Sequence, residues 1–232
     1  MSIVARLVAA AALLSLGAVS GYAQNFSGAQ KGEIEKIIRE YLIANPEVLQ
    51  EAIAALEKKH AADEAAKHQA AVKDNAQAIF NSPRQVTVGN PQGDVTFVEF
   101  FDYNCGYCKR AMVDMMELMK HDPKLKVVLK EFPVLGPASV EVARVAVAVR
   151  MQDKTGKKYL DFHQKLLSGR GQVDKARAIA AAKEAGLDVA RIEKDLGSDE
   201  VRLTLEESLK LAEKLGLNGT PSYVIGPHVV VG

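Results

Sequence analysis

"FVEFFDYNCGYCKRAMVDMM", residues 97–116, holds both cysteines of the chain at the point where one regular element ends and another begins. The run "DVTFVEFF", residues 94–101, is β-prone and continuous rather than alternating, which is typical of a central strand covered on both faces. The segment 109–120 is predicted to be helical, with a buried stripe formed by Met112, Met115, Met116 and Met119. A methionine-rich client surface is the alternative interpretation of that stripe. Both cysteines therefore lie in the turn between a buried strand and a helix.

The spacing of the cysteines places Cys105 at the N-terminus of the predicted helix. Unpaired backbone N–H groups and the helix dipole favour an anion there, and comparable positions lower a cysteine pKa to roughly 3.5–7.5. Cys108 lies about one turn further into the helix, so it can form a disulfide with Cys105. The pattern predicts that Cys105 exchanges with a sulfur of a client protein and that Cys108 then resolves the mixed disulfide.

Two simpler interpretations of the cysteines are weaker. A structural crosslink stabilises more as the loop it closes lengthens, and the loop between these two cysteines is very short. A structural zinc site usually takes four protein ligands. No close pair exists among the histidines, which are His60, His68, His121, His163 and His228. We therefore expect redox chemistry, with no metal and no bound cofactor.

The first 23 residues have the composition of a secretory signal. Arg6 precedes an apolar run over residues 7–19, and small residues follow up to Ala23, where we expect cleavage. The run is shorter than the roughly 20 apolar residues of a membrane helix, so no membrane span is expected after cleavage. Loss of Arg6 lowers the number of Lys and Arg residues from 30 to 29, against 29 Asp and Glu residues. A neutral chain argues against nucleic acid as a partner, and export indicates the periplasm, which tolerates disulfides.

Residues 24–81 are predicted to form an N-terminal helical extension. Its apolar residues recur at helical spacing, and Asn45-Pro46 suits the start of a second helix. After Leu56 the sequence has almost no large apolar residue before Val72, which predicts a solvated helical stalk. A short helical hairpin cannot build a core alone, so we expect the apolar head to associate with copies of itself. Docking on the main domain is the alternative.

Residues 82–232 are predicted to form one α/β domain. A short strand is expected in "RQVTVG", residues 84–89. The run "LKVVLKEFPV", residues 125–134, is another strand, and its distance from residues 94–101 requires a crossover through the helix after the cysteines. Residues 138–217 are patterned as helices and are expected to be a helical insertion. The final stretch, "PSYVIGPHVVVG", supplies two short strands that form a hairpin.

This order of elements, with a Cys-Gly-Tyr-Cys motif at a helix start and a distant Thr220-Pro221 before a hairpin, resembles the thioredoxin fold of DsbA-like thiol:disulfide interchange proteins. The resemblance covers residues 86–232. It implies that Thr220 and Pro221, joined by a cis peptide bond, face the cysteine pair and bind the client backbone. It also implies that Gly106 and Tyr107 contribute to client binding and help to tune the reduction potential.

Glu99 is a further residue to which the resemblance assigns a role. DsbA-like proteins keep a buried acid beneath the disulfide, and Glu99 lies within the predicted strand, six positions before Cys105. The implied role is to accept the proton of Cys108. A carboxylate in an apolar strand is costly unless it has a partner or a raised pKa. Lys130 in the neighbouring strand is a possible partner, and an exposed strand face is the alternative environment.

The stretch "IREYLIANPEVLQEAI", residues 38–53, is similar to the helical extension of suppressor-of-copper-sensitivity C proteins, in which the extension can assemble a trimer. The resemblance implies a homo-oligomer, with a trimer favoured, and several active sites around a shared cavity suit isomerisation. DsbA-like domains usually finish with a helix packed on the sheet. This sequence stops at Gly232 just after its last predicted strand, so we expect either a truncated sequence or a face covered in another way.

Together these features predict a periplasmic thiol:disulfide oxidoreductase, isomerase or reductase more than simple oxidase. Its expected partners are exported proteins with cysteines and a membrane redox partner that resets the cysteine pair. Two alternatives stay open. The cysteines could bind Cu(I), since soft thiolates favour that ion, or the domain could act only as a chaperone.

Overall fold

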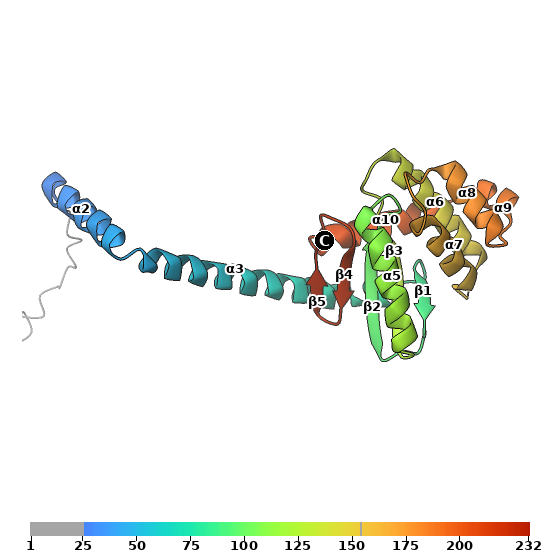
Figure 1. The fold of residues 1–232 in the computed structure, drawn as a ribbon, viewed down its shortest axis with the longest axis horizontal. Coiled ribbons are helices and arrows are strands. Elements are labelled where there is room, and N and C mark those ends of the chain that lie inside the picture. The colour runs from blue at the N-terminus through green and yellow to red at the C-terminus, as the bar shows by residue number, and fades with distance from the viewer. Residues whose placement is uncertain (1–25, 154) are drawn as a thin grey trace, which may run out of the picture. The chain divides into compact units, whose positions relative to one another are not determined.

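The computed structural model describes residues 26–153 and 155–232, and these residues contain one mixed five-stranded sheet. The strands are β1 (Val86–Gly89), β2 (Val95–Phe101), β3 (Leu125–Glu131), β4 (Ser222–Ile225) and β5 (His228–Val230). Their order in the sheet is β1-β3-β2-β4-β5, as Figure 1 shows. β2 and β3 are parallel and the other neighbouring pairs are antiparallel. The predicted crossover and the predicted C-terminal hairpin are both confirmed. The predicted leader, residues 1–23, lies outside the described residues.

Both faces of the sheet are covered, as the continuous pattern of residues 94–101 predicted. Successive side chains of β2 point to opposite faces. Phe97 and Phe101 belong to a core shared with helix α5 (Gly106–His121) and with the helical insertion, whereas Val98 and Phe100 belong to a second core on the opposite face. Glu99 shares the face of Phe97 and Phe101. The alternation therefore directs this carboxyl group toward the helix that carries the cysteines.

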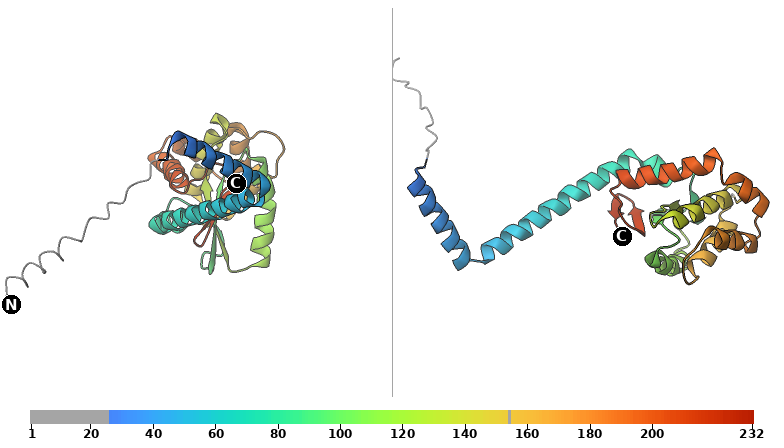
Figure 2. Two further views of the ribbon diagram at one scale, coloured as in Figure 1. Left: turned by 90° about the vertical axis from the view of Figure 1, so that its left-hand side faces the viewer. Right: turned by 90° about the horizontal axis from the view of Figure 1, so that it is seen from above.

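The expected helical insertion consists of several consecutive helices. These are α6 (Pro137–Gln152), α7 (Lys157–Leu167), α8 (Lys175–Glu184), α9 (Val189–Asp195) and α10 (Asp199–Lys214). Side chains of Asp174, Asp188 and Ser198 accept hydrogen bonds from backbone N–H groups at the starts of α8, α9 and α10, as N-caps do. Figure 2 shows α6 to α9 packed together at one side of the sheet, while α10 contacts β3 from the second core. The methionine stripe of α5 is a core stripe, since Met112 and Met115 are buried.

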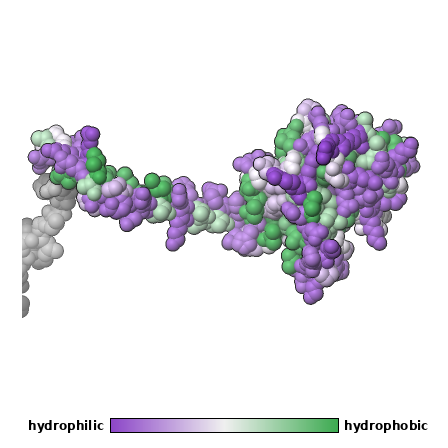
Figure 3. Space-filling view, in the orientation of Figure 1, coloured by the Kyte–Doolittle hydropathy of each residue, from purple (hydrophilic) through white to green (hydrophobic). Residues whose placement is uncertain are grey.

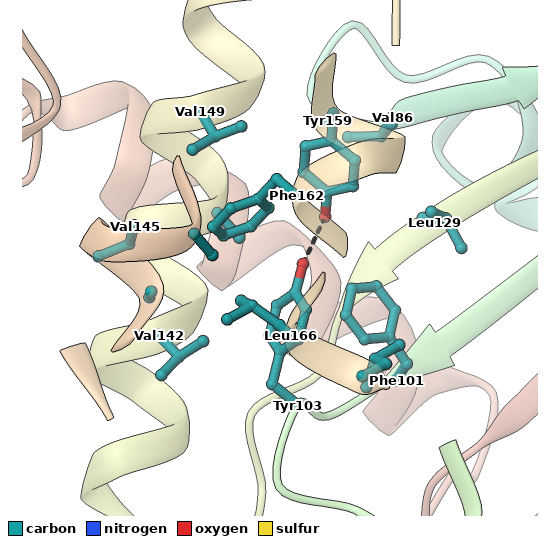
Figure 4. Close-up of a cluster of buried hydrophobic side chains, with 14 of the residues drawn as sticks. Val86, Phe101, Tyr103, Leu129, Val142, Val145, Val149, Tyr159, Phe162 and Leu166 are labelled. Atoms are coloured by element: carbon teal, nitrogen blue, oxygen red, sulfur yellow. Dashed lines mark hydrogen bonds between the residues drawn. The ribbon is translucent and has the colours of Figure 1, made fainter. Parts of the chain in front are cut away.

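The core beside α6 and α7 contains polar groups that are joined to one another. Figure 4 shows Tyr103 and Tyr159 pointing toward each other among apolar side chains, with hydroxyl oxygens 3.3 Å apart. Tyr159 also donates to Glu131 at 2.6 Å, and the Nδ1 atom of His163 lies 3.1 Å from the Tyr103 hydroxyl. Burial lowers the pKa of His163 to about 3, so this imidazole is neutral at physiological pH. Each buried polar group here has a hydrogen-bond partner, which offsets part of its desolvation cost.

The chain divides into two compact units, residues 1–58 and residues 59–232. Helix α3 (Glu47–Asp74) crosses this division and is followed by the short helix α4 (Ala76–Phe80). Val72 and Ile79 are 5% and 0% exposed, and both pack in the second core beneath the sheet. The expected boundary between residues 81 and 82 therefore falls inside the second unit, because the end of the predicted stalk supplies part of that unit's core.

The described part of the first unit consists of α2 (Gly28–Ala44) and the beginning of α3, and Asn45 is the C-cap of α2. None of the residues of α2 is buried. Figure 3 shows hydrophobic surface over α2 and the beginning of α3. The large exposed apolar side chains of these two helices include Ile34, Ile37, Ile38, Tyr41, Ile43, Leu49, Ile53 and Leu56. Among the described residues, no helix is long and apolar enough to cross a membrane.

Candidate active site

The site is built on the turn that follows β2. The carboxylate of Asp102, only 2% exposed, accepts hydrogen bonds from the Ser139 hydroxyl at 2.7 Å and from the backbone N–H groups of Asn104, Val134 and Leu135 at 2.8–3.0 Å. The backbone carbonyl of Asp102 accepts from the N–H of Cys105 at 3.0 Å. Asp102 thus fixes the turn against the segment that leads into α6, and the position of Cys105 follows from it.

Cys105 occupies the N-cap position of α5. Its backbone is extended, with φ −81° and ψ 121°, and its Sγ atom accepts the N–H of Cys108 at 3.3 Å. The sulfur therefore replaces the oxygen that usually caps a helix N-terminus. Cys105 is 5% exposed and Cys108 is fully buried, and both are free thiols. This difference in access makes Cys105 the sulfur that a second molecule reaches first.

The loop before β4 lies against Cys105. The Cys105 thiol donates a hydrogen bond to the backbone carbonyl of Thr220 at 3.1 Å. The Thr220–Pro221 peptide bond is cis, and both residues are partly exposed. The antiparallel pairing of β4 with β2 brings this loop to the cysteines from the far end of the domain.

Glu99 and Cys108 form the buried side of the site. Glu99 is 2% exposed, and burial raises the pKa of its carboxyl group to about 8. Burial also raises the pKa of the Cys108 thiol, and the nearby Cys105 sulfur and the Glu99 carboxylate raise it further. The alternative of an exposed strand face is thus wrong for Glu99. Its carboxyl group takes up protons near neutral pH, beside a thiol that releases its proton only with difficulty.

Lys130 is not the partner of Glu99. In the parallel register Glu99 lies opposite Leu129 and Phe100 opposite Lys130, so the two charged side chains point to opposite faces of the sheet. The Lys130 ammonium donates to the carbonyl of Ala78 at 2.6 Å and lies 3.8 Å from a carboxylate oxygen of Glu207. Burial lowers the pKa of Lys130 to about 8. The register of a parallel pair cannot be obtained from two strand segments alone, so the sequence could offer Lys130 only as a possible partner.

Tyr223 is a site residue that sequence reasoning missed. It lies directly opposite Glu99 in the β2–β4 pair, and its ring packs against Phe97 with centroids 5.0 Å apart. Burial raises the pKa of its phenol, and the charge of Glu99 raises it further. The available signal was its position two residues after Pro221, in the first strand of the predicted C-terminal hairpin.

Gly106 and Tyr107 lie between the cysteines at the surface. The Tyr107 side chain is among the most exposed aromatic groups of the described chain, at 67%, and the guanidinium carbon of Arg110 lies 4.6 Å from its ring centroid. Apart from its two chain neighbours and the backbone of its own helix, no atom lies within 4 Å of a Cβ placed on Gly106, so a side chain there would meet no other part of the described protein.

Asn104 was also missed, and it ties the turn to the insertion. Its side-chain amide donates to the Ser139 hydroxyl at 3.1 Å and to the Val173 carbonyl at 3.0 Å, and its oxygen accepts from the Val173 N–H at 2.7 Å. A polar residue just before the first cysteine was the only sequence signal. Within the described ranges, no group of three or more His, Cys, Asp or Glu side chains could hold a metal ion.

The structure brings together the predicted residues Glu99, Cys105, Cys108, Thr220 and Pro221, with Gly106 and Tyr107 at the rim. A helix-capping cysteine with a buried second cysteine, on a sheet flanked by helices, defines a thioredoxin-fold thiol–disulfide site. Residues 96–232 match the DSBA-like thioredoxin domain, and residues 30–63 match the copper resistance protein ScsC N-terminal domain. The chain therefore belongs to the DsbA-like thiol–disulfide oxidoreductase family.

Individual relatives agree with this assignment. A thioredoxin-like oxidoreductase from Silicibacter pomeroyi DSS-3 is 42% identical, with a TM-score of 0.63 over 67% of this chain and 88% of that one. Proteus mirabilis ScsC in a transitional conformation is 31% identical, with a TM-score of 0.63 over 89% of this chain and 90% of that one. A probable disulfide bond formation protein D of Bacillus cereus is 26% identical over 66% of this chain and 76% of its own length. A segment that covers 59% of this chain also matches several Na⁺/H⁺ antiporters of the NhaA group, but the match covers only 21–22% of the length of those proteins.

Proposed function

We propose that the protein is a periplasmic thiol:disulfide oxidoreductase that rearranges or reduces disulfides of exported proteins through Cys105 and Cys108. One observation carries the proposal. The Sγ atom of Cys105 lies between the N–H of Cys108, at 3.3 Å, and the carbonyl of Thr220, at 3.1 Å. The sulfur is thus held by its own helix on one side and by the loop of Pro221 on the other, with the second cysteine one turn behind it.

The reaction begins at Cys105. Its thiolate attacks one sulfur of a client disulfide, a new S–S bond forms, and the other client sulfur leaves as a thiolate. The N–H of Cys108 donates to the Cys105 sulfur and so favours negative charge on it before attack. The released client thiolate can then attack a different client disulfide or the mixed disulfide. Repetition of this exchange isomerises the client without net oxidation or reduction.

When no client thiolate resolves the mixed disulfide with Cys105, Cys108 resolves it, and the client disulfide is then reduced. Glu99 accepts the thiol proton of Cys108, and the Cys108 thiolate attacks the sulfur of Cys105. The client leaves as a second thiolate, and the two cysteines of the chain become a disulfide. With its pKa raised to about 8, a minor fraction of the Glu99 carboxyl group is ionised at near-neutral pH, and this fraction accepts the proton of Cys108 and later releases it. A membrane redox partner would supply two electrons to restore the dithiol.

The client backbone is proposed to bind beside the cis peptide bond. Thr220 and Pro221 are partly exposed next to Cys105, and Gly106 and Tyr107, which directly follow Cys105 in the chain, are exposed. An extended client segment can lie between these two pairs of residues with its disulfide over Cys105. Pro221 has no backbone N–H, so it cannot donate a hydrogen bond to a carbonyl group of the client.

An isomerase is favoured over a simple oxidase because of the first unit. Its helices expose a row of apolar side chains, including Ile37 at 64% and Ile53 at 56%. Such a surface is unfavourable in water unless it is covered, and a second and third copy of the same extension would cover it. A trimer would hold several cysteine pairs around one client. The leader-like residues 1–23 support a periplasmic location.

Reactivation of scrambled ribonuclease tests the proposal. The mature chain in a glutathione buffer should restore activity, and Cys105→Ser should lose that effect, whereas Ser168→Ala, an exposed hydroxyl outside the site, should keep it. Full reactivation by Cys105→Ser would exclude the mechanism and would leave a chaperone role. The same assay with a reduced client separates isomerase from oxidase, since only an oxidase needs no pre-existing disulfides.

Copper binding is a second candidate function, favoured by the match of residues 30–63 to a copper resistance protein domain. The two free thiols could supply the soft ligands that Cu(I) prefers. Retention of one Cu(I) per cysteine pair through gel filtration, without any disulfide exchange, would support this function instead.

A further inference from the structure

The start of α5 carries its charges in an unfavourable order. Lys109 and Arg110 lie within the first five residues of the helix, and the first turn contains no acid. The positive end of a helix dipole favours acidic side chains and disfavours cations. Two adjacent cations at this position, next to the reactive cysteine, therefore destabilise the helix. Their presence needs a reason other than helix stability.

Lys109 has a structural role that explains its presence. Its ammonium group donates to the carbonyls of Gly169 and Gly171 at 3.0 and 2.9 Å. These hydrogen bonds hold the loop between α7 and α8 against the start of α5. The charge of Lys109 is thus directed into the protein, and it is only partly exposed.

Arg110 has no comparable role. Within residues 26–153 and 155–232 no ion pair includes it, although Asp114 lies one turn further along the same helix. Its guanidinium group instead lies over the ring of Tyr107, 4.6 Å from the centroid. Side chains of a helix lean toward its N-terminus, so this stacking holds the charge close to the cysteine pair and in contact with solvent.

We propose that Arg110, stacked on Tyr107, selects clients that have an Asp or Glu next to the reactive cysteine. The inference rests on the proposed function, because it names the client class of the same site. In a mixed disulfide with Cys105 the client residues on either side lie about 3.5 Å per residue from the sulfur. Arg110 lies five residues along a helix that rises about 1.5 Å per residue, a rise of about 7.5 Å. A carboxylate next to the client cysteine is therefore within the distance of about 10 Å or more over which charges act at low ionic strength.

The test uses reduced enzyme and three synthetic peptides, each with one cysteine disulfide-linked to a chromophoric aryl thiol. Asp, Asn or Lys flanks the cysteine. The enzyme dithiol becomes a disulfide while the peptide thiol and the aryl thiol are released, and the second-order rate constant is read from the chromophore. We expect the Asp peptide to react about five- to tenfold faster than the Lys peptide at low salt, and this ratio should shrink as salt screens the charges.

Variants assign the preference to the residue. Arg110→Gln should bring the ratio close to one, and Arg110→Glu should reverse the preference. Arg144→Glu makes the same change of charge on an exposed face of α6 and should leave the ratio unchanged. Tyr107→Leu keeps the cation but removes its support, so the ratio should fall.

The outcomes separate the inference from the function on which it rests. Equal rates for the three peptides with wild-type enzyme overturn the preference and leave disulfide exchange intact. A preference that survives Arg110→Gln but is lost in Lys109→Gln overturns the assignment to Arg110. Absence of exchange with every peptide overturns both the inference and the proposed function.

Discussion

The thiol of Cys105 lies 3.1 Å from the carbonyl oxygen of Thr220, which is 115 residues further along the chain. The pairing of β4 with β2 makes this contact, and the cis peptide bond to Pro221 directly follows it. In the proposed reaction a client would reach Cys105 beside this loop, and the exposed Tyr107 lies two residues further along the chain. The same sulfur accepts the backbone N–H of Cys108 at 3.3 Å, so the start of α5 and the loop of Pro221 both contact the proposed attacking atom.

Substitution of the buried cysteine should trap clients. Cys108→Ser leaves Cys105 able to attack but removes the thiol that resolves the mixed disulfide. We expect covalent complexes with exported proteins, seen as high-mass bands on non-reducing gels that disappear on reduction. The Cys105→Ser,Cys108→Ser double variant serves as the control and should show none. Complexes of equal amount with the double variant would contradict the assignment of Cys105 as the attacking sulfur.

Glu99 should make the reduced protein less stable as pH rises. Its pKa is near 4.5 in an exposed setting and about 8 in the folded chain, so between these values the folded state binds more protons than the unfolded state. Its contribution to the free energy of unfolding is fully present below pH 4.5 and is lost as pH rises to about 8, at up to about 1.4 kcal/mol per pH unit.

Urea unfolding across this pH range provides the measurement. Glu99→Gln should remove most of the slope and should be more stable than the wild type by a few kcal/mol at pH 8. Glu117→Gln, an exposed acid on α5, should keep the slope. An unchanged slope in Glu99→Gln would show that its carboxyl group titrates normally.

Lys130 should have the opposite effect in a higher pH range. Burial lowers its pKa from 10.5 to about 8, so between these values the unfolded state binds more protons and stability rises with pH. Lys130→Met should remove this rise while leaving the slope below pH 8 in place. Calorimetric melting between pH 7.5 and about 10.5 checks it, and Lys120→Met, on the exposed face of α5, is the control. A rise that persists in Lys130→Met would assign it to another group.

Ile79 should be essential to the second unit although it lies in the predicted extension. It is fully buried in the core beneath the sheet, so Ile79→Ala should lower the free energy of unfolding by about 2–4 kcal/mol. Gln69→Ala, at an exposed position of α3, should change it by less than about 0.5 kcal/mol. Chemical denaturation followed by circular dichroism measures both. Equal stability of the two variants would show that Ile79 is not part of the core of the second unit. The boundary between the extension and the domain would then lie after residue 81, as the sequence predicts.

The exposed apolar residues of the first unit should control the oligomeric state. Ile37→Ser combined with Ile53→Ser removes two of the most exposed apolar side chains and should lower the mass found by light scattering. Disulfide isomerisation should fall with it, while exchange with a short peptide should not change. Lys36→Ser combined with Glu57→Ser changes neighbouring exposed residues and should keep the wild-type mass. A monomeric wild-type chain would remove the argument for a trimer.

Much of the fold and the chemical centre of the site follow from local pattern. The uninterrupted β-prone run over residues 94–101 predicts a strand covered on both faces, and a cysteine at a helix start predicts a capping sulfur, because both depend on neighbours in the sequence. The hairpin after Pro221 and the helical insertion were predicted in the same way. These features can be predicted without knowing which distant segments of the chain are in contact.

The tertiary structure alone decides the relationships that depend on register and on packing between distant segments. Whether Glu99 faces Lys130 or Tyr223 depends on how the strands slide against each other, and one residue of slip exchanges the two faces of a sheet. Whether Val72 and Ile79 are solvated or buried depends on a surface that composition does not describe. The sequence by itself thus determined the reactive sulfurs and the strand beneath them, whereas their surroundings came from long-range contacts, because side-chain burial belongs to the folded chain and not to any one segment.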